Sequence, residues 1–514
     1  MVDDQNENLR QNFARYVVSP GLMEDLQERT DRARSGREFD GSRRGLAPSA
    51  SFETRGAGGR HIGEPTSRVI IELNADYPGG LPAAKESTLV ILSGIGVGGR
   101  LPQADMSRYF LFANLTLGEL QALAVQRMPQ PYYKVWEDQP LKPLLHRSVR
   151  TIKGDACLTA FGADGKDVVV AVADSGIDGS HPHFSEYANL DLPAGIEHRD
   201  LTGTGSDPLV DEFGHGTHVA GIIAGRTCTA KVKSVRLGEM RDHGNTVTTV
   251  AEPMQGELIQ GVAPRAKLVS LKVLSGAGGG YASALIAALE YVQEVNDNGR
   301  RLKVHCVNLS LGYPFDAAWF AAGHSPLCAV VDRVSRSGVV VVAAAGNDGS
   351  AMLQTAGRTN RRRIAIQAIN DPGNAEEAIT VGATHAQAPH RYGVSYFSSR
   401  GPTADGRRKP DLVAPGERIL SCAAAGSEKL TTALDEAEKA VETGVAYFRE
   451  ESGTSMAAPH VAGAVAALLS VRGEFVGRPE AVKEIFVRSC TDLGRSVDFQ
   501  GAGLIDLMRA IQSV

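Results

Sequence analysis

A carboxylate, an imidazole and a hydroxyl stand at three distant points of the chain, each in a setting that favours chemistry. Asp174 directly follows the apolar run DVVVAVA, so its carboxylate falls at the carboxyl end of a predicted buried strand. His215 stands between two glycines in DEFGHGTHVAGIIAG, where small neighbours leave the ring accessible. Ser455 opens the predicted helix of SGTSMAAPHVAGAVAALLS. Together these residue types can perform nucleophilic catalysis, in which the imidazole activates the hydroxyl and the carboxylate orients the imidazole.

Two neighbouring features suit a nucleophile at Ser455. Its own N–H falls in the first helical turn, where N–H groups have no partner within the helix and can face developing negative charge. Pro459 has no N–H and cannot donate to the Ser455 carbonyl, which sets this turn apart from an ordinary helix. Asn347 follows the strand-like run VVVAAAG, and its carboxamide N–H is predicted to donate a hydrogen bond to an oxyanion. His218, one turn beyond His215, is predicted to be a packed structural histidine.

These segments, in the chain order Asp, His, Asn, Ser, resemble the subtilisin-like serine peptidases. The resemblance implies a serine endopeptidase with Asp174, His215 and Ser455 as its triad, and with Asn347 and the Ser455 N–H as its oxyanion hole. It covers nearly all of 151–514, because the same family likeness runs through GVAPRAKLVSLKVL (261–274), VNLSLG (307–312), FSSRGPTADGRRKPDLVAPGERI (397–419) and GAGLIDLMRAI (501–511).

The resemblance also assigns a groove for an extended polypeptide substrate, read mostly through its main chain. Ala344 and Gly346 belong to the wall of the primary specificity pocket, and Asp348 near its mouth either favours a basic side chain or is simply solvated. The chemistry requires no cofactor. Structural calcium lacks a clear motif, because 226–260 contains no convincing acidic cluster. The segments expected to pair with the peptide are Gly278, Gly279, Gly280, Tyr281 and Leu309, Ser310, Leu311, Gly312.

Predicted strands and helices alternate along 151–514 and must position these groups. This alternation predicts an α/β domain with a mostly parallel central sheet and helices on both faces. Helical stretches such as Ser283–Val295 separate apolar runs that lack polar alternation. Insertions relative to the family lie at 226–260 and 427–450, and the second predicts an amphipathic helix that either decorates the protease or gates access to Ser455. The predicted strands are Val168–Ala173, Lys267–Val273, Val304–Leu309 and Val339–Ala345.

A small α+β domain is predicted at 66–138, and it resembles the inhibitory propeptide of the same family. The chain's own N-terminal domain is then an intramolecular inhibitor, with 139–150 as linker and candidate processing segment; a generic structural domain is the alternative. A mobile extension is predicted at 1–65, with a helix at 19–34. The expected elements of the small domain are a helix opened by the capping box of Thr116 and Glu119, and strands at Arg68–Leu73, Thr88–Leu92, Arg108–Ala113 and Tyr132–Trp136.

Composition excludes several other classes of function. The 514 residues carry a net charge of −5, which argues against a nucleic acid partner. Six cysteines without a C-x-x-C pair indicate free thiols rather than a zinc site. The acidic, amide-rich N-terminus lacks the form of a secretory signal, and no apolar stretch reaches the about 20 residues of a membrane span, so a cytoplasmic location is expected.

Two short motifs resemble binding sites but have simpler explanations. Gly94, Gly96 and Gly99 match a nucleotide-binding pattern, but Leu101 and Pro102 stand where its helix should open. The basic run 361–363 is predicted to be a solvated loop. The leading hypothesis is a self-inhibited protease zymogen active inside the cell, and the alternative is a latent, occluded scaffold that acts by binding a partner. The sequence indicates no oligomeric state.

Overall fold

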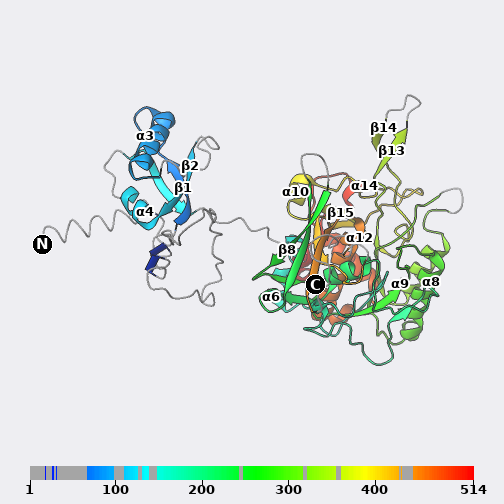
Figure 1. The fold of residues 1–514 in the computed structure, drawn as a ribbon. Coiled ribbons are helices and arrows are strands. Elements are labelled where there is room, and N and C mark those ends of the chain that lie inside the picture. Colours follow the sequence, from blue (N-terminus) through cyan, green and yellow to red (C-terminus); the bar gives the residue numbers. More distant parts are fainter. Residues whose placement is uncertain are drawn as a thin grey trace. The chain divides into compact units, whose positions relative to one another are not determined.

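The computed structural model of the chain forms two compact units, Met1–Pro143 and Leu144–Val514 (Figure 1). Most of the predicted extension 1–65, the linker 139–150 and the insertion helix at 427–450 lies outside the described residues. Within the predicted helix 19–34, the described positions 26–27 and 30–31 are helical. The structure describes residues 18, 26–27, 30–31, 66–97, 109–124, 130–137, 147–241, 247–316, 321–354, 360–427, 430 and 444–514.

The small unit is an antiparallel sheet in the order β2-β1-β3. Its apolar core gathers residues of both helices and of one sheet face, so the helices cover that face. This confirms the small α+β architecture expected from the sequence. The elements are β1 (Thr66–Leu73), α3 (Gly80–Gly94), β2 (Phe110–Thr116), α4 (Leu117–Ala124) and β3 (Tyr132–Glu137).

One strand predicted in the small unit is wrong: Thr88–Leu92 belongs to helix α3. Thr88 Oγ1 donates to the Ala84 carbonyl at 2.7 Å, and Ala84, Thr88 and Leu92 form the buried stripe of a helix. Burial of that stripe outweighs the strand propensity of the local run TLVIL. The glycine pattern that begins at Gly94 therefore follows a helix, not the strand that a nucleotide-binding motif needs.

The predicted capping box is confirmed at the start of α4. The Thr116 N–H donates to Glu119 Oε2 at 2.8 Å, and the Glu119 N–H donates to Thr116 Oγ1 at 3.3 Å. The apolar face that follows is buried, as the spacing predicts: Leu117, Leu120, Leu123 and Ala124.

The large unit is built on a seven-stranded sheet in the order β16-β15-β12-β11-β4-β10-β5, with every recorded pairing parallel. Along β4, Val170 and Val172 join one hydrophobic core while Val169 and Ala171 join the other, so both sheet faces are buried. The predicted α/β fold is confirmed. The strands are β4 (Val169–Asp174), β5 (Arg199–Asp200), β10 (Lys267–Lys272), β11 (Cys306–Leu309), β12 (Val340–Ala344), β15 (Ile379–His385) and β16 (Leu412–Glu417).

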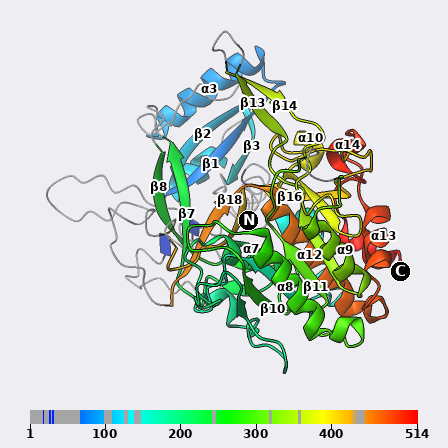
Figure 2. The ribbon, with the colours of Figure 1, turned by 90° about the vertical axis from the view of Figure 1, so that its right-hand side faces the viewer.

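Helices cover both faces of this sheet (Figures 1 and 2). Buried residues of α7 (His215–Ile223) and α12 (Thr454–Val471) lie in one core, and those of α8 (Ala282–Val295) and α9 (Pro326–Arg336) lie in the other. The remaining helices of four or more residues in the described part of this unit are α5 (Arg147–Thr151), α6 (Gly154–Phe161), α10 (Pro389–Tyr392), α13 (Pro479–Ser489), α14 (Val497–Gln500) and α15 (Leu507–Gln512).

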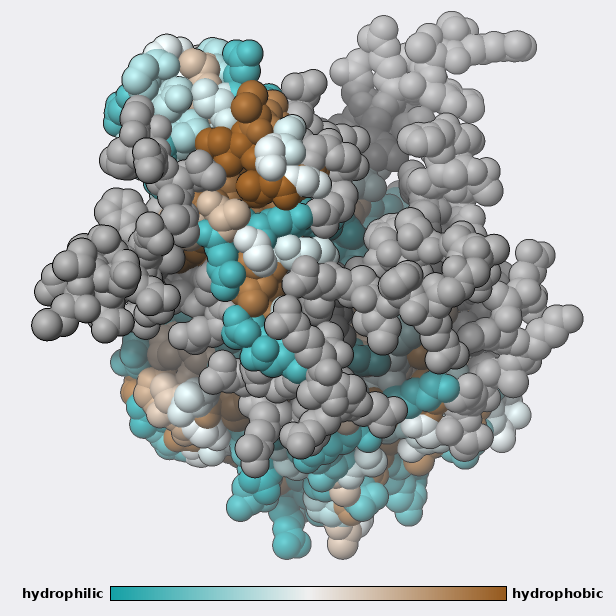
Figure 3. All heavy atoms as spheres, turned by 60° about the vertical axis from the view of Figure 1, so that its left-hand side comes forward, coloured by the Kyte–Doolittle hydropathy of each residue, from teal (hydrophilic) through white to brown (hydrophobic). Residues whose placement is uncertain are grey.

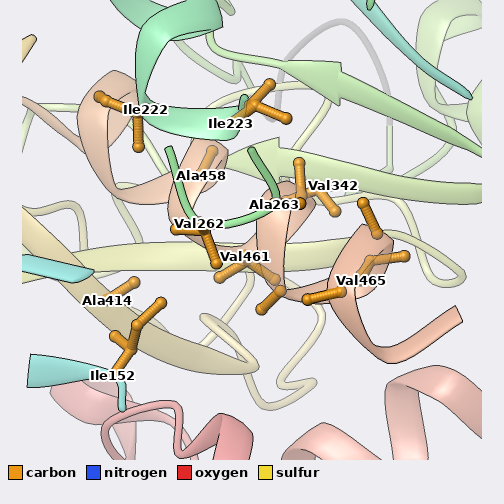
Figure 4. Close-up of a cluster of buried hydrophobic side chains, with 14 of the residues drawn as sticks. Ile152, Ile222, Ile223, Val262, Ala263, Val342, Ala414, Ala458, Val461 and Val465 are labelled. Carbon is orange, nitrogen blue, oxygen red and sulfur yellow. The ribbon is translucent and has the colours of Figure 1, made fainter. Parts of the chain in front are cut away.

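Helix α12 runs through the middle of the larger core. Figure 4 shows Ala458, Val461 and Val465 of this helix close to Val262 of a loop and Val342 of β12. Among the described residues it is the one helix whose length and composition would allow it to cross a membrane, but 83% of that segment is buried inside the fold. Its apolarity is thus accounted for by the protein core.

The two insertions meet in one four-stranded sheet, which we call the accessory sheet, in the order β17-β18-β7-β8. The first insertion supplies β7 (Ser234–Arg241) and β8 (Val247–Met254). The second supplies β18 (Ala446–Glu451), which pairs with β7 in parallel and with β17 (Ile419–Cys422) in antiparallel fashion. The helix predicted over 427–450 is therefore wrong at its C-terminal end, where 446–450 belongs to strand β18, and no strand was predicted in either insertion.

Two short antiparallel pairs complete the described strands, β6 with β9 (Arg226–Cys228 and Leu258–Gln260) and β13 with β14 (Ser350–Gln354 and Asn360–Ile364). The basic run 361–363 lies in β14, so the predicted loop is wrong at this point: main-chain pairing with β13 orders it as a strand. All six cysteines are free thiols, as expected.

Candidate active site

The Asp174 carboxylate and the His215 ring are in contact. His215 Nδ1 lies 2.8 Å from Asp174 Oδ1, and the Ser175 N–H donates to the same oxygen at 2.8 Å. Asp174 ends β4 and is fully buried, whereas the His215 side chain keeps 15% of its surface exposed. With Nδ1 facing the carboxylate, Nε2 on the other side of the ring is the nitrogen that can exchange a proton with a substrate or nucleophile.

Close packing of α7 against the end of β4 produces this contact. A Cβ atom at Gly216 would lie 2.1 Å from the Gly176 carbonyl oxygen, so the residue after His215 must be glycine. Gly214 caps the helix with φ of 82°, in the left-handed region that favours glycine. The two glycines beside the histidine therefore allow its backbone to approach the strand that carries Asp174.

A buried carboxylate not predicted from the sequence, Asp211, holds the turn that presents His215. Its Oδ1 accepts from the Gly214 N–H at 2.6 Å and from Ser175 Oγ at 2.8 Å. Its Oδ2 accepts from the Thr217 N–H at 2.8 Å and from Thr217 Oγ1 at 2.6 Å. Asp211 is 2% exposed, and burial raises its pKa. The available signal was an acidic residue just before the helix, where it can accept from first-turn N–H groups.

Ser455 is the second residue of α12, and Pro459 lies inside that helix. The missing Pro459 N–H is replaced at the Ser455 carbonyl by the Ser310 hydroxyl, which donates at 2.8 Å. Asn308 Nδ2 donates in turn to Ser310 Oγ at 2.8 Å. Ser310 was predicted only for the substrate groove, so this contact was missed. The signal was present, since a buried carbonyl without its helical donor needs another partner.

Asn347 is tied to the start of α12 through its carbonyl oxygen. Oδ1 accepts from the Thr454 N–H at 2.9 Å and from Thr454 Oγ1 at 3.1 Å. The amide nitrogen Nδ2 lies 3.5 Å from the place that a Cβ atom on Gly453 would take. The acceptor of the carboxamide is thus used to orient it, and its donors lie beside the residues that precede Ser455.

These residues share one cleft of about 460 Å³, which is lined by His215, Asn347 and Ser455. Leu309 and Gly279 are not in its lining; Leu309 is fully buried in the core on the α8 side, because it still belongs to β11. Apolar lining residues that were not predicted for the groove are Phe213, Val273, Leu274, Ala282, Leu285, Tyr313 and Leu327. The residues predicted for the groove that do line it are Gly278, Gly280, Tyr281, Ser310, Leu311, Gly312, Ala344 and Gly346.

His218 is a packed structural histidine, as predicted. It is fully buried, and its Nε2 lies 3.2 Å from the carbonyl oxygens of both Ile419 and Arg449. Burial lowers the pKa of His218 to about 4, so the ring is neutral near pH 7. Within the described ranges, no group of three or more His, Cys, Asp or Glu residues is arranged to hold a metal ion.

Comparison with known proteins decides the family. The sequence profile of the Subtilase family matches residues 165–503, which is more than half of the chain. The chain belongs to the subtilase family. It is 31% identical over 353 residues to serine protease AprX of Bacillus subtilis (strain 168), a match that spans 68% of this chain and 66% of AprX.

Two further subtilase relatives come from the same organism. Subtilisin E is 30% identical over 412 residues, covering 79% of this chain and 83% of subtilisin E. The protein named major intracellular serine protease is 30% identical over 345 residues. The match covers 67% of this chain and 81% of that protein. The family match and the subtilisin relatives show that the chain is a subtilisin-like serine protease. Members of this family are endopeptidases that act on polypeptides.

Proposed function

We propose that this subtilase cleaves peptide bonds with Asp174, His215 and Ser455 as its catalytic triad. The observation that carries the proposal is the 2.8 Å contact of His215 Nδ1 with Asp174 Oδ1, at a cleft that Ser455 also lines. Ser455 Oγ attacks the scissile carbonyl carbon while His215 Nε2 takes its proton. His215 then gives that proton to the leaving amine, and Asp174 holds the ring in the required tautomer.

Asn347 Nδ2 and the Ser455 N–H donate hydrogen bonds to the carbonyl oxygen and stabilise the negative charge that develops on it. The contacts of Asn347 Oδ1 with Thr454 support this role, because a donor oriented before the reaction needs no reorganisation in the transition state. The position of Ser455 in the first turn of α12 adds a favourable helix dipole.

The substrate is an extended polypeptide segment that pairs with backbone at Gly278–Tyr281 and Ser310–Gly312. Support comes from the shared cleft, which is lined by glycines and apolar side chains. Ala344 and Gly346 leave room for a large side chain beside the scissile bond, and Asp348 lies on the same lining.

Replacing Asn347 with Asp is expected to lower kcat about 10²–10³-fold with little change in KM, the magnitude known for loss of the equivalent donor in subtilisin itself. Asp keeps an oxygen that accepts from Thr454 but loses the N–H donors and adds a negative charge beside the oxyanion, so the variant measures loss of the donor together with charge repulsion. Asn347→Ala, which loses both, is the matched comparison. Steady-state kinetics on a peptide substrate measures the effect, and an Asp variant with wild-type kcat would exclude Asn347 from the oxyanion hole.

We further propose that the enzyme is made as a zymogen, inhibited by its own small unit and released by cleavage within 139–150. The match to subtilisin E supports this proposal. It covers 79% of the 514 residues, which is more than the unit Leu144–Val514 contains, so the match extends into the N-terminal unit.

The small unit also has an aromatic sheet face opposite its helices. Ile70 stands opposite Phe112 on one side and Trp136 on the other, and Phe110 lies on the same face with 36% of its surface exposed. Figure 3, which turns this unit forward, shows apolar surface among hydrophilic neighbours. Such an exposed apolar face is typical of an interaction surface, and we call it the docking face.

Labelling of Ser455 by a fluorophosphonate tests the zymogen. The full chain is expected to react slowly until it is cut within 139–150, and Phe110→Asp should react faster without a cut because a charge on the docking face weakens inhibition. Val90→Asp is the matched control, since Val90 is 67% exposed on α3, away from that face. Equal labelling of cut and uncut protein would contradict self-inhibition, and no labelling of either would favour the scaffold alternative.

A cytoplasmic site of action is part of the same proposal. One relative is named major intracellular serine protease, and all six cysteines of this chain are free, as suits a reducing compartment.

A further inference from the structure

The accessory sheet reaches the turn that holds His215 through one side chain, Arg449 of β18. Arg449 is 8% exposed, and its Nη2 donates at 3.3 Å to the carbonyl oxygen of Gly214, the residue immediately before His215. The same guanidinium forms an ion pair with Glu451. The backbone carbonyl of Arg449 also lies 3.2 Å from Nε2 of His218. One residue of the accessory sheet therefore contacts both Gly214, just before the catalytic histidine, and His218, one turn after it.

Both ends of the second insertion converge on Gly214. A Cβ atom on this glycine would lie 2.9 Å from Cβ of Ser427, where the insertion begins, and 3.6 Å from Nη2 of Arg449, near its end. The Gly214 N–H is held from the other direction by Asp211 Oδ1 at 2.6 Å. The two polar groups of Gly214 are thus fixed separately, the N–H by a buried carboxylate and the carbonyl by Arg449.

The accessory sheet fixes Arg449 in turn. Arg449 stands opposite Ser421 of β17 and Leu237 of β7, so it lies in an inner strand paired on both sides. Arginine suits the position because its planar guanidinium can serve a carbonyl and a carboxylate at the same time. Alanine would leave the Gly214 carbonyl without this donor.

We propose that Arg449 is a positioning residue for His215, supplied by an accessory sheet to which both insertions contribute strands. Arg449 does not act on the substrate; it holds the Gly214 carbonyl, and through it the peptide group that leads into His215. Loss of the contact lets this peptide rotate and moves the imidazole relative to Ser455. A displacement of about 1 Å in a catalytic group can cost about 10²-fold in rate. The proposal rests on the catalytic role of His215 proposed above.

Arg236→Ala is a matched control for Arg449→Ala. Arg236 lies on the neighbouring strand β7 and forms an ion pair with Glu450, the residue next to the Glu451 partner of Arg449. The Arg236 side chain is 14% exposed and the Arg449 side chain is 10% exposed. Its recorded polar contact is with Glu450 and not with Gly214. Either variant removes one ion pair of the accessory sheet, but only Arg449→Ala removes the contact with the turn before His215.

The full chain is expressed and allowed to mature before kinetics are measured. In this matured enzyme, Arg449→Ala is expected to lower kcat about 10- to 100-fold, with KM changed less than about threefold. Arg236→Ala should keep kcat within about threefold, and Arg449→Lys, which keeps a donor and the charge, should fall between. Equal losses of kcat in the two alanine variants would show that Arg449 merely stabilises the sheet and would overturn the proposal, as would wild-type kcat in Arg449→Ala.

A second measurement does not depend on catalysis. In the uncut Ser455→Ala chain, added Arg449→Ala should speed hydrogen exchange of the amides in 211–223, while added Arg236→Ala should not. Unchanged exchange there would overturn the proposal even if the triad assignment holds. If Arg449→Ala does not fold, Glu451→Gln removes the ion-pair partner and Arg449→Lys remains for the same comparison. Failure of the triad itself would show differently, as activity retained by Ser455→Ala.

Discussion

Ser455→Ala is expected to lower peptide hydrolysis about 10⁶-fold, the magnitude known for loss of the nucleophile in subtilisin itself. Without Oγ no acyl-enzyme forms, and what remains is the effect of binding and of the oxyanion donors. The variant should also stay uncut: intact-mass measurement of the purified wild type should show cleavage near 139–155, and the variant should keep its full 514 residues.

Ser452→Ala is the control for this prediction. Ser452 lies three residues before Ser455, and its Oγ accepts from the Arg418 N–H at 2.9 Å. Removing this hydroxyl should leave both hydrolysis and self-cleavage intact. Cleavage of the Ser455→Ala chain at the same site would assign processing to another protease, and hydrolysis at the wild-type rate would reject Ser455 as the nucleophile.

Asp174→Asn is expected to lower kcat about 10⁴-fold while KM stays close to that of the wild type. The carboxylate accepts from His215 Nδ1 at 2.8 Å in this structure. An amide can instead donate to Nδ1, which favours the tautomer with its proton on Nε2 and removes the base that Ser455 needs. Fluorophosphonate labelling of Ser455 should slow in parallel.

Asp200→Asn is the matched control, because Asp200 also ends a strand of the same sheet. Its carboxylate accepts from Thr202 and Ser206 within its own loop, and these bonds help to hold its pKa below the usual value. Its loss should affect that loop and leave kcat within about threefold. A similar loss of kcat in both variants would mean that Asp174 supports the fold rather than the histidine.

Much of the large unit could be predicted because its signals are local. The strands β4, β10, β11 and β12 are short apolar runs between turn residues, which is the pattern of strands buried on both faces. Asp174 directly follows such a run, so its place at a strand end could be predicted from its neighbours. The capping box of α4 was equally local, since it depends on residues three positions apart.

The errors arose where tertiary burial outweighs local preference. Thr88–Leu92 is rich in strand-forming residues, but packing of Ala84 and Leu92 in the core of the small unit makes it helical. Leu309 is a different case: its main-chain pairing with the peptide stays a prediction, but alternation along β11 turns its side chain into the core on the α8 side.

The order and types of the chemical groups were visible in the chain: an acid after one strand, a histidine between glycines, an amide after another strand and a serine at a helix start. What could not be seen was how distant segments meet. Pairing of β18 with β7 brings Arg449 to Gly214, and Ser310 reaches the Ser455 carbonyl, through contacts between residues far apart in sequence. Such contacts depend on burial and on main-chain hydrogen bonding across the whole unit, which no local pattern encodes.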